Sequence, residues 1–467
     1  VLIYLIINEV SMEITLQNLG ALEYANFSLG DLTIICGKNN TGKTYATYAL
    51  FGFLSFWKNQ FEYPISDDKI KELLFTGKVE IDLQDCINEL QQVIKTTCNE
   101  YTKLLPSIFA SEEKKFENSS FEMHLDFPSV NLNEKYNRVL SSGNKNEVLS
   151  ISKEEGNSKL IISFLVTEDK AKFPQQIITK FVGEALKDIL LPEFLPNPFI
   201  VSAERTGAAI FRKELNFARN RLLEEISSSS KDINPLKLIF NVTNDYALPV
   251  KMNVEFTRNL EQTFKSQSFI VKEYPEIINN FLNIIGGDYL VTKNDELYFS
   301  PAKKKIKLTM DESSSGVRSA LDLGFYLKHV AQKGDLLIVD EPELNLHPEN
   351  QRKIARLFAQ LVNIGIKVFI TTHSDYIVRE LNTLIMLNSD KPHIKKIQQE
   401  EGYTSLEILD YSKVKVYIAE QAKIPSKHRK VNTLTEAPID KNGIEVKSFD
   451  ETIEKINQIQ EAIVWGE

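Results

Sequence analysis

The segment GKNNTGKT, residues 37–44, constrains this chain more than any other feature of its sequence. It follows a short apolar run, 32–36, and precedes a segment of helical character, 44–54, so the order strand, loop and helix is predicted. In that context the spacing GxxxxGK[ST] is typical of a loop that wraps phosphate groups. Its glycines let the backbone approach closely, while loop N–H groups and the helix N-terminus supply partial positive charge.

The chemistry of such a loop predicts roles for its side chains. Lys43 is expected to reach the β- and γ-phosphates and to act in catalysis, and Thr44 to bind Mg²⁺ through its hydroxyl. The predicted ATP-binding residues are Gly37, Asn39, Asn40, Thr41, Gly42, Lys43, Thr44 and Tyr45.

A second apolar run, DLLIVDEPE at 335–343, ends in two adjacent carboxylates. If the run is a strand, Asp340 and Glu341 lie at the carboxyl edge of the sheet, where ligands bind. We expect Asp340 to hold the magnesium shell and Glu341 to polarise the attacking water. A solvated turn is the alternative for this pair alone, but the phosphate loop requires such carboxylates. No guanine-reading NKxD motif follows, so ATP is favoured over GTP.

Composition narrows the class of protein. The 467 residues carry a net charge of −9, which argues against a uniformly basic nucleic-acid-binding protein but allows a local positive stripe. Cys36, Cys86 and Cys98 show neither zinc-site spacing nor a disulfide framework, so a cytoplasmic location is expected. The apolar start, 1–7, is shorter than the roughly 20 residues that span a bilayer, so no membrane insertion is expected.

The motifs fall in two stretches separated by a long middle, which predicts one α/β domain split by an insertion. Met12 opens a run typical of a first strand, and we expect 1–11 to be an upstream extension. The expected parts are the first half of the head at 12–60, a mixed α/β insertion with a helical arm at 61–285, the second half at 286–390, and a segment closing the head at 391–467.

Local patterns predict further elements. Strands are expected at 367–372 and 413–419, and a β-meander at 288–310. Helices are expected at 70–74, 87–104, 175–190, 212–227, 348–363 and 450–464.

The segment SSSG, residues 313–316, precedes a helical stretch at 317–331. Alone, it is typical of a serine N-cap. Its position before the carboxylate strand resembles the signature segment of ABC-type ATPases. That resemblance implies that Ser314, Ser315 and Gly316 contact the γ-phosphate bound by a second subunit, and that His373 in TTHS, 371–374, is a catalytic switch residue that senses the γ-phosphate.

These elements, together with PELNLHPENQ at 342–351 and FIVSAERTG at 199–207, resemble the OLD-like and SMC-like branch of ABC ATPases. The resemblance implies an ABC-type P-loop head with a central, mostly parallel sheet, an antiparallel β subdomain and a helical insertion. It also implies ATP and Mg²⁺ as cofactors and a head-to-head dimer or higher homo-oligomer. The magnesium-contacting glutamine of that branch has no clear counterpart here, and Arg205 is equally compatible with a structural and a nucleotide-linked role.

Members of that branch commonly serve in anti-phage defence or DNA maintenance, often beside a nuclease. Residues 388–467 lack the Glu and DxD strand ends of a Toprim nuclease. In this respect the chain resembles the AriA-type ATPases of PARIS systems, and next the PtuA-type ATPases of Septu. The expected partner is a separate effector nuclease such as a Toprim protein, with a nucleic acid or a phage protein as trigger. A repair ATPase that binds DNA directly is the alternative. The lysines of segment 303–307 either contact nucleic-acid phosphates or discourage aggregation at an exposed strand edge. A transporter subunit is disfavoured by the large insertion.

Overall fold

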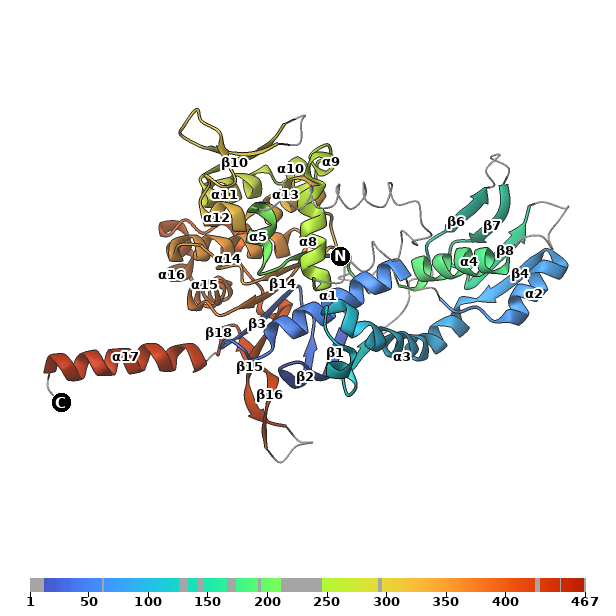
Figure 1. Cartoon of the computed structure of the whole chain (residues 1–467), viewed down its shortest axis with the longest axis horizontal. Coiled ribbons are helices and arrows are strands. Elements are labelled where there is room, and N and C mark those ends of the chain that lie inside the picture. Colours follow the sequence, from blue (N-terminus) through green and yellow to red (C-terminus); the bar gives the residue numbers. More distant parts are fainter. Residues whose placement is uncertain are drawn as a thin grey trace, which may run out of the picture. The chain divides into compact units, whose positions relative to one another are not determined.

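The computed structural model describes residues 12–60, 63–125, 133–141, 147–165, 174–191, 195–210, 246–292, 296–424, 429–445 and 447–465. The chain divides into two compact units, and two of the boundaries between them fall inside helices α1 (Lys43–Gln60) and α3 (Leu83–Ile108) (Figure 1). The first unit contains residues up to 14, 53–103 and 121–196. The second contains 15–52, 104–120 and everything from 197 onwards.

The second unit is built on a six-stranded sheet with the order β16–β15–β3–β14–β13–β9. Five of these strands are parallel, and β16 pairs antiparallel with β15 at one edge. The inner strands β3 and β13 are buried along their whole length, as expected for a parallel sheet covered on both faces. The expected central, mostly parallel sheet is confirmed. The strands are β3 (Leu32–Gly37), β9 (Pro198–Val201), β13 (Leu336–Asp340), β14 (Lys367–Thr372), β15 (Val414–Lys423) and β16 (Lys430–Glu436).

Helices connect these strands. α1 follows β3 through the phosphate loop, α14 (Pro348–Asn363) joins β13 to β14, and α15 (Asp375–Met386) follows β14. The predicted bounds of α14 and β14 agree with the structure. The prediction of one continuous helix at 317–331 is wrong. The segment forms two short helices, α12 (Ser315–Ser319) and α13 (Leu321–Phe325), followed by a π-helical turn, η3 (Tyr326–Val330). There the N–H of Ala331 bonds to the carbonyl of Tyr326, five residues back, which widens the last turn.

Smaller elements complete the second unit. The predicted β-meander is confirmed as an antiparallel sheet of β10, β11 and β12. β9, which lies within the stretch predicted as the insertion, pairs with β13 and so belongs to the main sheet of the second unit. The elements are β1 (Met12–Leu19), β2 (Leu22–Ser28), α5 (Arg205–Ile210), α8 (Leu248–Arg258), α9 (Leu260–Thr263), α10 (Phe269–Glu273), α11 (Pro275–Ile285), β10 (Gly287–Val291), β11 (Leu297–Pro301), β12 (Leu308–Thr309), α16 (Pro392–Glu400), β17 (Ile439–Asp440), β18 (Gly443–Ile444) and α17 (Lys447–Trp465).

The first unit contains an antiparallel sheet with the order β4–β8–β7–β6, against which α2 and α4 pack. Stacked Phe53 and Phe121, both edge-on to Tyr101, form part of its core. The three helices predicted here are present, but the sheet was missed. The helix predicted at 212–227 lies outside the described residues. The elements are α2 (Asp67–Thr76), β4 (Lys78–Asp82), β5 (Ser120–Leu125), β6 (Tyr136–Ser141), β7 (Glu147–Lys153), β8 (Lys159–Phe164) and α4 (Gln175–Leu190).

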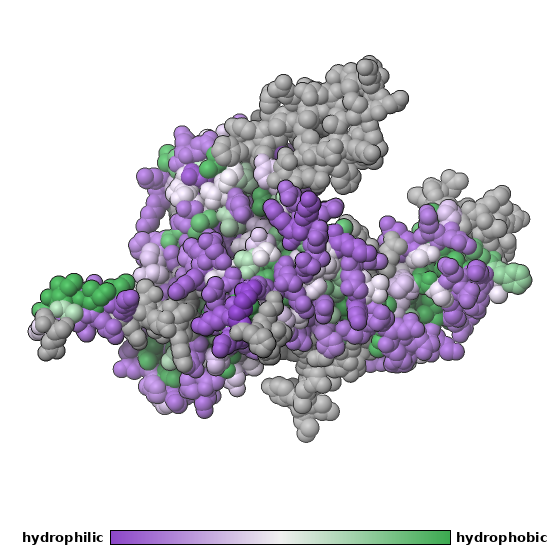
Figure 2. Space-filling model, turned by 60° about the horizontal axis from the view of Figure 1, so that its bottom comes forward, coloured by the Kyte–Doolittle hydropathy of each residue, from purple (hydrophilic) through white to green (hydrophobic). Residues whose placement is uncertain are grey.

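The C-terminal helix α17 presents an apolar face. Figure 2 shows the apolar residues gathered along it, and Ile456, Ile459, Ile463, Val464 and Trp465 are exposed. Among the helices that the structure describes, none is both long enough and apolar enough to cross a membrane.

Candidate functional site

Three loops meet at the carboxyl edge of the main sheet. The phosphate loop follows β3, the two carboxylates lie at and just after the end of β13, and the switch segment, residues 371–374, spans the end of β14. The register pairs Asp340 with Thr371 and Cys36 with Thr372, so the three strands end level with one another. Parallel strands that end together place their loops side by side, which is where open α/β sheets bind ligands.

Lys43 is a buried cation at this edge. Its Nζ donates hydrogen bonds to the carbonyl oxygens of Gly37, at 2.9 Å, and Lys38, at 2.8 Å. Burial lowers the pKa of Lys43, and the nearby carboxylates of Glu341, Asp340 and Glu343 oppose that change. The predicted lysine and carboxylates therefore lie close enough to interact electrostatically.

The phosphate loop adopts left-handed backbone at Asn40 (φ 62°) and Gly42 (φ 97°). A Cβ atom at position 42 would come within 2.5 Å of the side chain of Leu22, so only glycine fits there. Asn39 and Thr44 are exposed beside it. The Tyr45 ring stacks on Phe109 at 5.2 Å, a packing contact in addition to its predicted role in ATP binding.

Asp340 has the properties of a metal ligand. Its Oδ1 accepts a hydrogen bond from the Thr371 hydroxyl, while its buried Oδ2 has no hydrogen-bond partner among the described residues. Burial raises the pKa of Asp340 to about 6. A free carboxylate oxygen and the Thr44 hydroxyl are hard oxygen ligands of the kind Mg²⁺ prefers, so these residues fit the ion. In the described part of the chain, no group of three or more His, Cys, Asp or Glu side chains could bind a metal.

Glu341 lies in an unfavourable backbone conformation. Its φ of 52° is in the left-handed region, which a residue with a Cβ atom enters at a cost of about 1–2 kcal/mol. The N–H of Glu341 donates to the carbonyl of Thr371 at 3.0 Å, and its own carbonyl accepts from Arg205. Strain of this kind gathers at functional sites.

Arg205 holds the backbone of Asp340 and Glu341 in place through hydrogen bonds. It is buried, and it donates four hydrogen bonds to carbonyl oxygens: from Nε to Ser319, from Nη1 to Ser202 and Asp340, and from Nη2 to Glu341, all between 2.7 and 2.9 Å. These bonds join the end of β9, the signature helix α12 and the end of β13. Of the two roles that the sequence left open, the contacts favour the structural one.

His373 lies beside two glutamates. Its Nδ1 is 3.2 Å from Oε1 of Glu343 and 3.7 Å from Oε1 of Glu341. The backbone N–H of His373 also donates to Oε1 of Glu343, at 2.8 Å. Sequence reasoning missed Glu343, although it stands two residues after Glu341 in the same motif.

The signature segment caps α12. The Ser314 hydroxyl accepts from the N–H of Val317, which is the N-cap that the sequence suggested. A Cβ atom at Gly316 would come within 2.9 Å of the Asn345 carbonyl oxygen, so a side chain there would collide with the loop that follows the carboxylates. In the described residues, no polar contact joins Ser314, Ser315 or Gly316 to the phosphate loop. Lys43, Asp340, Glu341 and His373 thus form one cluster without the signature serines.

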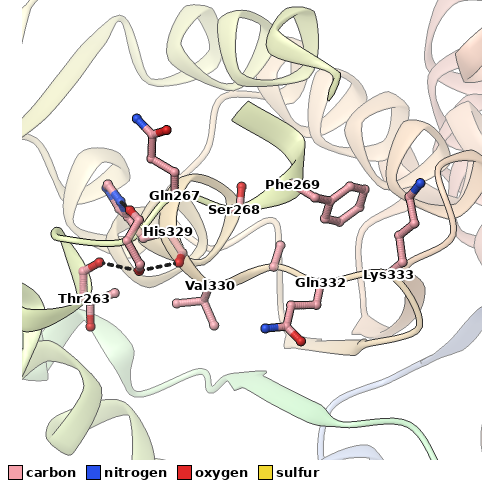
Figure 3. Close-up of a pocket in the computed structure, with 10 residues that line it drawn as sticks. Thr263, Gln267, Ser268, Phe269, His329, Val330, Gln332 and Lys333 are labelled. Atoms are coloured by element: carbon pink, nitrogen blue, oxygen red, sulfur yellow. Dashed lines mark hydrogen bonds between the residues drawn. The ribbon is translucent and has the colours of Figure 1, made fainter. Parts of the chain in front are cut away.

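A separate hollow of about 630 Å³ opens beside η3 (Figure 3). At its wall, Ser266 Oγ lies within hydrogen-bond distance of the carbonyl oxygens of Thr263, at 2.9 Å, and His329, at 2.8 Å. Its lining contains none of the predicted site residues.

Comparisons with known proteins assign the chain to a family. Residues 12–378 match the family model described as AAA ATPase domain. No curated protein matches the chain.

Similar solved structures include an Smc head bound to the C-terminal winged-helix domain of ScpA, an SMC head domain from Thermotoga maritima, and an Smc head domain with an extended coiled coil from Pyrococcus furiosus. They are 10%, 9% and 12% identical, with TM-scores of 0.34, 0.29 and 0.31. They cover 91%, 92% and 97% of this chain and 97%, 99% and 100% of their own. At such scores these similarities add nothing to the assignment. The family match, which spans most of the chain, does: the chain belongs to the AAA ATPase domain family and is an ATP hydrolase.

Proposed function

We propose that the chain is one head of an ABC-type ATPase and that two such heads close around ATP. This closure regulates a separate effector. The observation that carries the proposal is the cluster of Lys43, Asp340, Glu341 and His373 at one sheet edge. The signature serines share no polar contact with the phosphate loop in the described residues, which supports a site completed by a second copy.

In this proposal each residue has one task. Lys43 neutralises the β- and γ-phosphates, Glu341 polarises the attacking water, and His373 hydrogen-bonds to the γ-phosphate. Thr44 and Asp340 would hold Mg²⁺, which offsets the charge of the triphosphate when bound. Ser314, Ser315 and Gly316 of the partner subunit present a hydroxyl and N–H groups to the same phosphate.

A complementation experiment tests the composite site. Lys43→Ala disables the phosphate loop and Ser314→Arg the signature, so each variant alone should lack ATPase activity. In an equimolar mixture, half of the dimers are mixed, and each mixed dimer holds one site with both parts intact. Recovery of about a quarter of the wild-type rate is expected. No recovery, with mixed dimers present by native mass spectrometry, would refute the composite site.

For the effector, we propose a separately encoded nuclease, such as a Toprim protein, in bacterial anti-phage defence. The support is the resemblance of the motifs to the OLD-like and SMC-like branch of ABC ATPases, whose members often act beside a nuclease. Affinity purification of the tagged chain expressed with its neighbouring genes tests it. A stoichiometric nuclease is the expected result, and recovery of the chain alone, with no effect on phage infection, would contradict the proposal.

One observation favours the alternative of a DNA-repair ATPase. Lys303, Lys304, Lys305 and Lys307 are all exposed between β11 and β12. If this loop contacts phosphates, exchanging the four lysines for alanine should weaken DNA binding and flatten its salt dependence. Salt-insensitive binding, or no DNA-stimulated turnover, would remove this alternative.

A further inference from the structure

Glu204 lies at the edge of the main sheet where the phosphate loop and the motif carboxylates meet. It follows the last residue of β9, Val201, and β9 pairs parallel with β13 so that Val201 stands opposite Val339. Asp340 comes directly after Val339, so Glu204 and Asp340 leave neighbouring strands at the same carboxyl edge. The sequence motifs gave no role to Glu204.

A shared donor joins the backbone around Glu204 to that of Asp340. Nη1 of Arg205 donates to the carbonyl oxygens of both Ser202, at 2.7 Å, and Asp340, at 2.8 Å. The backbone N–H of Ser202 donates to the side chain of Asn253 at 2.8 Å. The segment that carries Glu204 is therefore held beside the end of β13.

A tyrosine of helix α1 holds the Glu204 side chain. The Tyr48 hydroxyl donates to Oε2 of Glu204 at 2.8 Å, and the Tyr48 side chain is buried. Tyr48 stands four residues after Thr44, so the two side chains lie on the same face of α1, one turn apart. Glu204 is exposed, and its Oε1 has no hydrogen bond to the described residues. That oxygen is available for a ligand.

Glu204 and Asp340 repel each other electrostatically. They lie near enough for their negative charges to interact, and Asp340 is buried with its Oδ2 unpaired among the described residues. Neighbouring carboxylates are unfavourable unless a cation or a proton accompanies them. A glutamine at position 204 could accept the Tyr48 hydrogen bond without this repulsion. Stability alone therefore does not explain a carboxylate here.

This edge offers three side-chain oxygens of the kind that Mg²⁺ prefers: the Thr44 hydroxyl, Oδ2 of Asp340 and Oε1 of Glu204. Mg²⁺ usually keeps several waters and also binds substrate phosphates, so few protein ligands suffice. Only two of the three residues are acidic. The site therefore agrees with the finding that the described residues hold no metal-binding group of three or more His, Cys, Asp or Glu.

We propose that Glu204 is a ligand of the magnesium ion beside Thr44 and Asp340, and that Tyr48 positions its carboxylate. The assignment rests on the proposed function, since the ion accompanies ATP there. It predicts that Glu204 sets the metal affinity of the nucleotide-bound protein, whereas the loop around Lys43 binds the nucleotide itself.

Mn²⁺ binding to the full chain tests the assignment. Mn²⁺ takes the place of Mg²⁺, and electron paramagnetic resonance measures its free fraction while protein is in excess over the non-hydrolysable analogue AMP-PNP. Glu204→Ala is expected to weaken Mn²⁺ binding about ten- to a hundredfold, and Glu204→Gln less, because the amide keeps a neutral oxygen. Glu273→Ala, at an exposed ion pair with Lys333, should bind Mn²⁺ like the wild type. Wild-type Mn²⁺ affinity in Glu204→Ala would overturn the proposal.

Nucleotide binding without metal separates this outcome from failure of the proposed function. Calorimetric titration with AMP-PNP in EDTA should give similar affinities for the wild type and Glu204→Ala, because only the ion loses a ligand. Equal weakening of nucleotide binding with and without metal would show a general loss of the site and would overturn the assignment. A wild type that binds no nucleotide would refute the proposed function, and the assignment with it.

Stability without ligands distinguishes a metal ligand from a purely structural partner of Tyr48. Glu204→Gln keeps the acceptor and removes the repulsion from Asp340, so its Tm without nucleotide and metal should be no lower than that of the wild type. Tyr48→Phe leaves the carboxylate in place and should weaken Mn²⁺ binding less than Glu204→Ala does. A Glu204→Gln variant that is less stable than the wild type, yet binds Mn²⁺ normally, would assign Glu204 a structural role and overturn the proposal.

Discussion

Arg205 donates a hydrogen bond from Nη2 to the carbonyl oxygen of Glu341 at 2.9 Å. The same guanidinium bonds to the carbonyl of Asp340, so one side chain fixes the backbone of both motif carboxylates. Because Arg205 also bonds to Ser319 in α12, a displacement of the signature helix would shift the backbone of the two carboxylates.

The first prediction concerns this anchor. Arg205→Lys keeps the charge but removes the planar fork, so hydrogen bonds to the carbonyls of Ser319, Asp340 or Glu341 are lost. We expect the free energy of unfolding to fall by about 2–4 kcal/mol and kcat to fall more than ATP affinity. Urea denaturation and ATP titration check this. Arg429→Lys, at an exposed ion pair with Glu23, is the matched control and should change stability by less than about 0.5 kcal/mol.

Glu341→Gln should stop hydrolysis and trap the ATP-bound dimer. The amide cannot accept the proton of the attacking water, but it keeps the size of the side chain, so ATP still binds. Native mass determination with and without ATP measures the trapped dimer. A monomer–dimer balance that ignores ATP in this variant would contradict the two-headed mechanism.

The backbone at Glu341 gives a separate prediction. At φ 52°, glycine is relaxed whereas alanine is strained. Glu341→Gly should therefore be more stable than Glu341→Ala by up to about 1 kcal/mol, although neither should hydrolyse ATP. Thermal unfolding of the two proteins decides it. Equal stability would show that the left-handed conformation is not retained at this position.

Lys43→Ala should weaken ATP binding itself rather than only the chemical step, because it removes the charge that neutralises the triphosphate. It also removes the hydrogen bonds to Gly37 and Lys38, so circular dichroism should confirm that the variant folds. Calorimetric titration with ATP measures the effect. Retained wild-type affinity in the folded variant would contradict the placement of the loop.

The buried carboxyl group of Asp322 predicts that the folding stability depends on pH. Burial raises its pKa to about 7, while Thr257 and Arg205 oppose that rise. Between about pH 4 and pH 7 the unfolded chain releases this proton and the folded chain keeps it, so stability contributed by the site falls as pH rises. Asp322→Asn removes the titration, and we expect the wild type to lose on the order of 2–4 kcal/mol relative to the variant across this window. Urea unfolding at several pH values measures the difference. The exposed control Asp68→Asn should follow the wild type, and parallel curves for Asp322→Asn would refute the assignment.

Local motifs were predictable because their chemistry is carried by neighbouring residues. The strand, phosphate loop and helix predicted at 32–54, the strand that ends in Asp340, and the bounds of α14 and β14 follow from apolar runs, glycines and short-range spacing. The buried parallel sheet followed from strands that are apolar on both faces.

The sequence by itself identified the groups that we propose to bind and hydrolyse a nucleotide; the tertiary structure decided how they are held. Arg205 contacts carbonyls more than 100 residues away, and any backbone offers a carbonyl, so no residue pattern marks its partners. Glu343 became a partner of His373 only when β13 and β14 paired in register. Strand pairing and burial are long-range properties, and they select one partner among many side chains of the same kind.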